Sequence, residues 1–212
     1  MNKIVFIADF FANEIAGGGE LNNQELIEIL RERGTHVLEV KSNKLTPEFI
    51  SECSERVKFI VANFIMLSEE SKTMLENDRE YIIYEHDHKY VKSRNPANYD
   101  NFIAPKSEII NFSFYKNAKA VLCQSKFHAG IVESNLKLDN IISLGGNLWS
   151  EDSLETLSRI AVEARMMGLS VITNDMVGAT KEDWFSFKGA ELIKIMDNKR
   201  KEIPDLVERT FG

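Results

Sequence analysis

The chain has 212 residues, of which 43% are hydrophobic and 28% charged, which is typical of a globular protein with one large or two small domains. Its formal net charge of −7 does not favour binding to a nucleic-acid phosphate backbone. Cys53 and Cys123 lack metal-ligand spacing and fit a reducing compartment. Asp9 and Glu14 break the apolar run near the start, so we expect no signal peptide or membrane span there and a cytoplasmic protein.

Short apolar segments alternate with segments of helical pattern. The segment KIVFIA at 3–8 is too short for a helix and rich in branched apolar residues, which predicts a buried strand. Thr46 followed by Pro47 marks the start of a helix. We expect further strands at 36–40, 57–62, 80–84, 118–124 and 140–144, and further helices at 20–33, 68–76, 107–117 and 125–136. This alternation predicts an α/β fold with a Rossmann-like parallel sheet, covered by helices on both faces, that binds ligands beyond the carboxyl ends of its strands.

Three consecutive glycines, Gly17, Gly18 and Gly19, lie between the first predicted strand and the helix that Gly34 ends. Glycine reaches backbone conformations that other residues avoid, and a helix N-terminus presents free N–H groups to an anion. The loop therefore predicts a site for a diphosphate or a carboxylate. The spacing is not the GxGxxG pattern, and a simple turn is an equal alternative.

A dense group of ionisable side chains follows the predicted strand at 80–84. Neighbouring residues point in different directions and no distant ligand set is evident, so the pattern does not favour a metal site. A solvated surface loop without function is the alternative to a binding or catalytic loop. The residues concerned are Glu85, His86, Asp87, His88, Lys89 and Arg94.

The segment SLETLSRIAVEARMMG at 153–168 predicts a helix with Glu155, Arg159 and Glu163 on one face and apolar residues on the other. One interpretation is structural: Asp152 and Glu155 form a capping box, and Glu155 pairs with Arg159. The other is functional. Two carboxylates roughly 12 Å apart along the axis can bracket a polyhydroxylated ligand, because carboxylates accept hydrogen bonds from vicinal hydroxyls.

This segment, with its seven residues between Glu155 and Glu163 and the following LSVITN and VGATKEDW, resembles the donor-binding E-x7-E segment of GT-B retaining glycosyltransferases, in particular glycosyltransferase family 4, or group 1. The segment AKAVLCQSKFH is similar to the end of the N-terminal domain in that family, although Ser125 itself reads as a helix N-cap. The resemblance implies that Glu155 lies near the donor sugar and that Glu163 holds the nucleotide ribose.

The same resemblance assigns further roles. A histidine of the N-terminal domain contacts the transferred sugar, which makes His86 the first candidate and His88 the second. The catalytic candidates are therefore His86 and Glu155. The donor-binding candidates are Gly17, Gly18, Gly19, Arg159, Glu163, Gly178, Ala179 and Thr180. The acceptor-binding candidates are Asp87, His88 and Arg94, and no metal ligand is expected.

The chain departs from the family in the region before residue 153, where a complete second domain would add strands and a phosphate-binding motif. We expect a Rossmann-like domain at 1–143 and an abbreviated donor-binding lobe at 144–212, with a strand at 169–173 and turns at Gly145, Gly146 and Gly178. Trp184 and Phe185 are expected to anchor a core. C-terminal helices interrupted at Pro204 should pack back on the first domain or, in a homo-oligomer, on another copy.

The expected function is a retaining, metal-independent glycosyltransferase that moves a sugar from a nucleotide-diphosphate sugar, its substrate rather than a cofactor, to an acceptor hydroxyl. The acceptor is open between a glycan, a small molecule and a modified DNA base, the last because the chain resembles glycosyltransferase-like proteins of bacterial and phage genomes. The alternative is a non-catalytic sugar-nucleotide-binding or regulatory protein derived from the GT-B fold. An unrelated single-domain nucleotide-binding protein is a third possibility.

Overall fold

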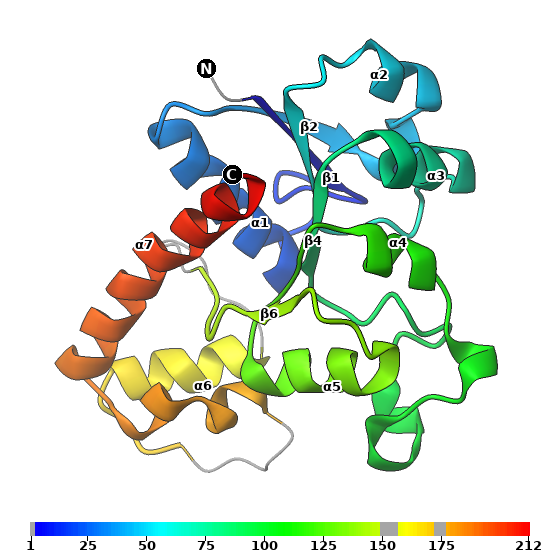
Figure 1. Ribbon diagram of the computed structural model, residues 1–212. Coiled ribbons are helices and arrows are strands. Elements are labelled where there is room, and N and C mark those ends of the chain that lie inside the picture. Colours follow the sequence, from blue (N-terminus) through cyan, green and yellow to red (C-terminus); the bar gives the residue numbers. More distant parts are fainter. Residues whose placement is uncertain (1–2, 149–156, 172–176) are drawn as a thin grey trace.

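The computed structural model describes residues 3–148, 157–171 and 177–212, and its described strands form one six-stranded parallel sheet in the order β2-β1-β3-β4-β5-β6 (Figure 1). Each predicted strand segment between 3 and 144 overlaps one of these strands. The fold is therefore α/β and Rossmann-like, as the alternation predicts. The strands are β1 Lys3–Ala8, β2 His36–Lys41, β3 Val57–Val61, β4 Tyr81–Glu85, β5 Val121–Cys123 and β6 Ile141–Ser143.

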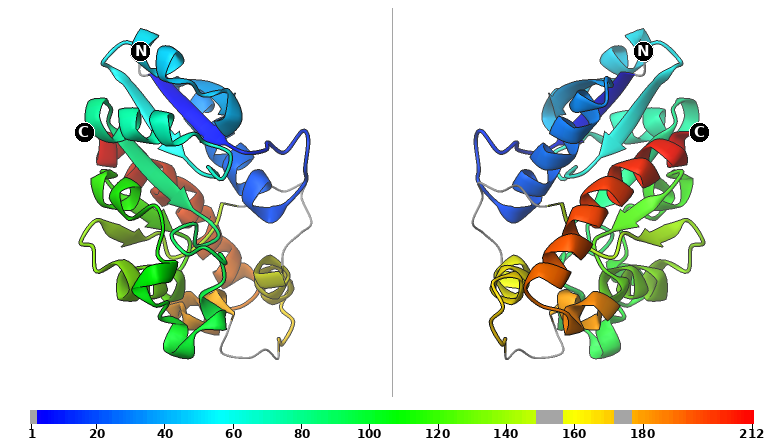
Figure 2. Two further views of the ribbon diagram at one scale, coloured as in Figure 1. Left: turned by 90° about the vertical axis from the view of Figure 1, so that its right-hand side faces the viewer. Right: turned by 90° about the vertical axis from the view of Figure 1, so that its left-hand side faces the viewer.

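Helices cover both faces of the sheet (Figure 2), and this explains why most residues of the central strands are apolar and buried. Val5 and Ile7 of β1 belong to one apolar cluster, while Ile4 and Phe6 belong to the other. The first cluster includes side chains of α2 Pro47–Glu52, α3 Glu69–Asp78, α4 Phe112–Asn117 and α5 Lys126–Leu136. The second includes side chains of α1 Gly18–Glu32 and α7 Ala190–Phe211.

The predicted helix starts are confirmed where a side chain caps the helix. Thr46 accepts a hydrogen bond from an amide of α2, and Ser125 does the same for α5. The helix predicted at 107–117 is shorter, because Ile109 forms a β-bridge with Val91 and Asn111 has a left-handed φ of 54° just before α4. Short 3-10 helices complete the described part: Ser42–Lys44, Pro96–Asn98, Asp100–Phe102, Lys106–Glu108, η5 Gly178–Lys181 and η6 Asp183–Ser186.

The C-terminal part contains α6 Leu157–Met166, η5, η6 and α7, which enclose a third apolar cluster. Trp184 lies in this cluster and Phe185 packs against it, which confirms both as core anchors. The strand predicted at 169–173 is not present at 169–171, because Gly168, with a φ of 84°, ends α6 and the Leu169 amide donates to Ala164 instead. Positions 172 and 173 lie outside the described residues.

The predicted interruption at Pro204 is wrong, since α7 is one helix of 22 residues with Pro204 inside it. Its packing against the sheet is confirmed. Ile203 and Val207 join the apolar cluster of α1, and Arg33, just after α1, pairs with Asp205 and Glu208 at 2.6 and 3.0 Å. No helix of the described residues has the length and apolar character needed to cross a membrane.

Candidate functional site

The loops that follow β1, β3, β4, β5 and β6 meet at one edge of the sheet, because all of these strands run parallel (Figure 1). The strand order reverses between β1 and β3, since the chain places β2 on one side of β1 and all later strands on the other. Ligands of open α/β sheets bind at this edge, beside such a reversal. The candidate site is therefore built from the residues just after these strands.

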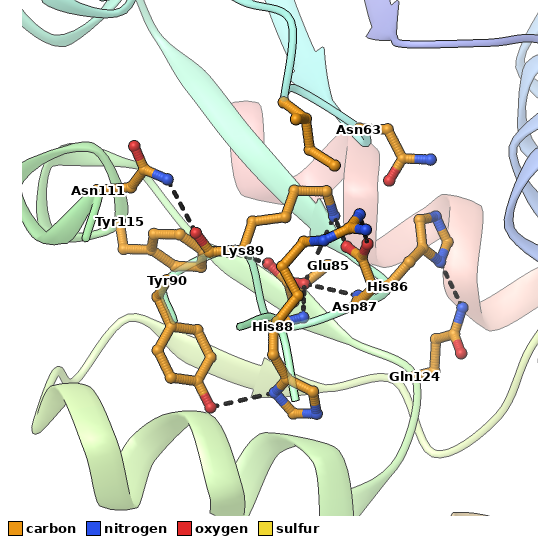
Figure 3. A network of polar contacts seen from close by, with 12 residues as sticks. Asn63, Glu85, His86, Asp87, His88, Lys89, Tyr90, Asn111, Tyr115 and Gln124 are labelled. Carbon is orange, nitrogen blue, oxygen red and sulfur yellow. Dashed lines mark hydrogen bonds and ion pairs between the residues drawn. The ribbon is translucent and has the colours of Figure 1, made fainter. Parts of the chain in front are cut away.

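The loop after β4 is organised around the buried carboxylate of Glu85, whose exposed fraction is 0% (Figure 3). Its oxygens accept hydrogen bonds from the backbone N–H groups of Asp87 and His88, at 2.9 and 2.7 Å, and from the hydroxyl of Tyr115. The ammonium group of Lys89 lies 3.6 Å from the same carboxylate. Glu85 thus folds the next residues back over the end of their own strand.

The charges of this loop are paired with one another. Burial alone would raise the pKa of Glu85, but Lys89 and the hydrogen bond from Tyr115 lower it to about 2, so the carboxylate is ionised. Lys89 is only 2% exposed and also pairs with Asp87, which in turn binds Arg94 at 3.0 Å. The network holds His88 at a left-handed φ of 56°.

His86 is held on both of its ring nitrogens. Nε2 lies 2.8 Å from the side-chain oxygen of Asn23 in α1, and Nδ1 bonds the side-chain amide of Gln124 just after β5. Burial, with a contribution from Lys89, lowers the pKa of His86 to about 3, so the ring is neutral. Since Gln124 donates to Nδ1, Nε2 carries the proton and donates to Asn23. A methyl group at Gly19 would touch this ring at 3.7 Å.

A pocket of about 230 Å³ opens beyond the ends of β5 and β6, between α5 and the C-terminal segments. Its wall combines neutral polar groups, aromatic rings and the single carboxylate of Glu182, and no lysine or arginine of the described residues lines it. The lining residues are His88, Gln124, Ser125, Phe127, His128, Ile131, Gly146, Asn147, Val162, Gly178, Ala179, Glu182 and Trp184.

Two histidines meet in the wall of this pocket. The ring centroids of His88 and His128 are 4.3 Å apart, and Nδ1 of His88 lies 3.1 Å from the hydroxyl of Tyr90. Nε2 of His128 is buried and has no hydrogen-bond partner among the described residues. Burial, reinforced by His88, lowers the pKa of His128 to about 3, and burial also lowers the pKa of His88. The pocket therefore carries uncharged imidazoles at neutral pH.

The N-terminus of α5 forms another part of the wall. Ser125 accepts a hydrogen bond from the backbone of His128 at 3.1 Å, and the carboxylate of Glu182 accepts one from the backbone of Lys126 at 2.6 Å. Gly178 packs directly on Ser125, since a Cβ at Gly178 would lie 2.7 Å from its hydroxyl oxygen. A side chain at this position would require the hydroxyl of Ser125 or one of the two segments to shift.

The structure brings three of the predicted residues into this pocket, namely His88, Gly178 and Ala179. His86 does not line the pocket as described, but it is hydrogen-bonded to Gln124, which does. Thr180 is not among the described lining residues, and its hydroxyl binds the carbonyl of Val177 at 2.8 Å.

The other predicted residues lie elsewhere. Asp87 and Arg94 pair with each other on the surface, and Gly17, Gly18 and Gly19 form the start of α1. Glu155 lies outside the described residues, and so does the side chain of Arg159, whose backbone belongs to α6. Glu163 is in α6, next to the lining residue Val162, but is not itself among the described residues that line the pocket.

Gln124, His128 and Glu182 are site residues that the sequence reasoning did not single out. The strand-end and helix-start pattern of AKAVLCQSKFH is the signal that could have identified Gln124 and His128, because it places both at the carboxyl edge. Glu182 carries no such signal, since its position depends on how η5 folds against α5. Among the described residues, no group of three or more His, Cys, Asp or Glu residues has an arrangement that could hold a metal ion.

The chain was compared with known proteins at the level of family and of sequence. No protein-family model matches it, and no curated protein matches it either.

Proposed function

We propose that this protein is a glycosyltransferase that moves a sugar from a nucleotide-diphosphate sugar to an acceptor hydroxyl. One observation carries the proposal: the pocket gathers the loop after β4, the start of α5 and the Gly178–Ala179 turn at the carboxyl edge of a parallel sheet. The resemblance to family 4 glycosyltransferases locates a sugar contact in the loop after β4 and donor contacts in the Gly178–Ala179 turn. They are far apart in the sequence, and the fold brings them together.

The chemistry of the wall favours a sugar ring over a phosphate. The hydroxyl of Ser125, the amide of Gln124 and the carboxylate of Glu182 can exchange hydrogen bonds with sugar hydroxyls, and Trp184 supplies an aromatic surface. The volume is below the roughly 300–1,000 Å³ of pockets that enclose a drug-sized ligand. In this proposal the pocket receives the sugar, and the nucleotide extends out of it.

Within this proposal His88, rather than His86, lies beside the reacting carbon. His88 lines the pocket and has one ring nitrogen next to Tyr90, which leaves the other for a ligand. Both ring nitrogens of His86 already have protein partners. His86 then acts indirectly, by fixing Gln124 in the wall of the pocket.

The test is a panel of UDP, GDP and ADP sugars, with nucleotide release and calorimetric binding both measured. We expect one donor to bind and to release its nucleotide, and His88→Asn to slow release at least tenfold, because the variant loses a group at the reacting carbon. The matched control is His36→Asn on the exposed end of β2, which should leave release unchanged. Release unaffected by His88→Asn would overturn the role of His88.

A second test addresses the donor. If Glu163 holds the ribose, as the resemblance implies, Glu163→Ala should weaken donor binding at least tenfold while the variant keeps its thermal stability. An unchanged dissociation constant for the donor would remove Glu163 from the site.

The second candidate function is a sugar-nucleotide-binding protein without turnover. Two observations favour it: all described strands belong to a single sheet, and no lysine or arginine among the described residues lines the pocket to stabilise a departing diphosphate. Binding of a sugar nucleotide with no hydrolysis and no transfer over the whole panel would establish this candidate and exclude the enzyme.

A further inference from the structure

Glu182 supplies the only carboxylate among the described residues that line the pocket, and its side chain belongs to a residue that is 5% exposed. Its Oε1 atom accepts a hydrogen bond from the backbone N–H of Lys126 at 2.6 Å, while the ammonium group of Lys126 pairs with Asp183 at 2.7 Å. The other oxygen, Oε2, has no hydrogen bond or ion pair with a described residue. A carboxylate that leaves water costs free energy unless it is paired, so Glu182 can still accept a cationic partner.

The nearest other ammonium group, that of Lys199 in α7, does not fill this role. A Cβ at Gly145 would lie 3.3 Å from Nζ of Lys199 and 3.5 Å from Oε2 of Glu182, so the two side chains approach the same glycine. Lys199 pairs with Glu202 at 3.0 Å, however, and it is not among the described residues that line the pocket. The charge of the pocket wall, as far as the structure describes it, is therefore negative and unbalanced.

The rest of the wall adds neutral acceptors and aromatic faces. The side-chain nitrogen of Gln124 donates to His86, so the side-chain oxygen points away from that ring (Figure 3). The two histidines of the wall are uncharged at neutral pH, because burial lowers their pKa values. Phe127 and Trp184 contribute aromatic rings. A carboxylate, neutral acceptors and aromatic faces are the groups that bind an ammonium ion, and they repel an anion.

A purely structural role for Glu182 is the alternative. A carboxylate at the start of α5 stabilises the helix through the Lys126 amide and the helix dipole, without any ligand. The two roles have different requirements. Glutamine keeps a side-chain oxygen that accepts from Lys126, whereas only a carboxylate supplies the charge that pairs with an ammonium group. The variant Glu182→Gln therefore separates them.

We propose that the pocket binds a sugar that carries a protonated amino group, with Glu182 as its ion-pair partner and Gln124 as a second acceptor. That this amino sugar is the group transferred from the nucleotide rests on the proposed function. The preference for an ammonium group does not, since it follows from the unbalanced carboxylate and the wall around it.

A titration with three free sugars gives a direct test. Full-length protein labelled with ¹⁵N is titrated at about pH 6 with D-glucosamine, whose amine is then protonated, and with the neutral D-glucose and N-acetyl-D-glucosamine. The reporters are the indole N–H of Trp184 and the backbone N–H of Lys126, which donates to Glu182. We expect both signals to shift with D-glucosamine, with a dissociation constant at least tenfold below those of the neutral sugars. No response to D-glucosamine, or equal affinity for all three sugars, would overturn the proposal.

Two variants show whether the carboxylate is the cause. In Glu182→Gln the preference for D-glucosamine over D-glucose should fall below about twofold, while the melting temperature stays close to that of the wild type. Asp183→Asn is the matched control, because this neighbouring carboxylate is 92% exposed and is not among the described lining residues. It should keep the full preference. A preference that survives Glu182→Gln would leave Glu182 with the capping role alone and contradict the proposal.

The nucleotide-release assay separates this inference from the proposed function. The UDP, GDP and ADP sugars are tested in matched pairs, glucosamine against glucose. If both proposals hold, one glucosamine donor releases its nucleotide at least tenfold faster than its glucose counterpart, and Glu182→Gln removes the difference. A preference for free D-glucosamine with no release from any donor would sink the glycosyltransferase alone. Release from a glucose donor, with no preference for the amine, would sink the ammonium site alone.

Discussion

The two walls of the pocket are held in place by different forces. The wall from β4, β5 and α5 belongs to a sheet whose strands are hydrogen-bonded to their neighbours and covered by large apolar clusters on both faces. The wall from α6, η5 and η6 rests on one small cluster around Trp184. It meets the first wall through a few polar contacts, among them the Trp184 indole on the carbonyl of Gly145 at 2.6 Å.

This difference indicates how the site can work. Regions with few buried apolar contacts open at a lower free energy than the core of a sheet. The sheet wall therefore provides the fixed geometry of His88, Gln124 and Ser125, while we expect the wall of α6 and η5 to open at a lower free energy. The experiments below test this division, starting with the largest expected effect.

Trp184→Ala should destabilise the C-terminal wall by about 4 kcal/mol, because the indole is 9% exposed and fills the centre of its cluster. Hydrogen exchange should accelerate in α6 and at the start of α7, while β1, β3 and β4 keep their protection. Phe187→Ala is the matched control, since that ring is 43% exposed. An equal loss of protection in the sheet would show that both walls unfold as one unit.

Glu85→Gln tests the sheet wall. The substitution leaves the buried ammonium group of Lys89 with Asp87 alone, so we expect a loss of about 3 kcal/mol in the free energy of unfolding by urea. The matched control is Glu80→Gln, an exposed partner of Lys58 and Lys119, which should cost less than about 1 kcal/mol. If the two variants are equally stable, Glu85 does not organise the loop after β4.

The same two walls differ in how far the sequence predicts them. Every strand of the sheet could be predicted, because a buried parallel strand is a short continuous apolar run between turn residues. The C-terminal part could not be predicted as well. The segment 169–171 has the composition of a strand, yet α6 ends at Gly168. The amide of Leu169 then donates to the carbonyl of Ala164 in the helix terminus rather than to a neighbouring strand. Pro204 lies inside α7, because the packing of this helix on α1 outweighs the low helix propensity of proline.

The sequence reasoning named three of the residues that line the pocket, His88, Gly178 and Ala179, but not its arrangement. The loop after β4 was identified by its ionisable residues, but the sequence could not show which histidine faces the pocket. That choice depends on the left-handed turn at His88, which the buried Glu85 imposes through its hydrogen bonds. His128 and Glu182 depend on tertiary contacts between α5 and η5, and such contacts leave no local pattern.

The histidines make the stability of the pocket depend on pH. His128 has a pKa of about 3 in the folded protein and about 6.5 when unfolded, so between these values the unfolded chain binds more protons. Its contribution to stability is full above about pH 6.5 and is lost as the pH falls toward 3. His128→Asn should reduce the slope of unfolding free energy against pH by up to about 1.4 kcal/mol per pH unit in this range. A slope unchanged by His128→Asn would mean that His128 is not buried in its neutral form.

The smallest effect concerns the contact that joins α7 to the end of α1. Arg33 binds Asp205 and Glu208 and also the carbonyl of Lys201 at 3.2 Å, but these acidic partners are largely exposed, so Arg33→Ala should cost no more than about 1 kcal/mol. The informative measurement is where the loss appears. Because Arg33 reaches across to α7, its removal should accelerate hydrogen exchange in 190–211 more than in the strands, and the difference should shrink in high salt.

Arg31→Ala is the matched control, since Arg31 binds Glu39 and the carbonyl of Val37 in β2 instead. If both variants affect α7 equally, the ion pairs of Arg33 do not contribute specifically to the attachment of the C-terminal helix.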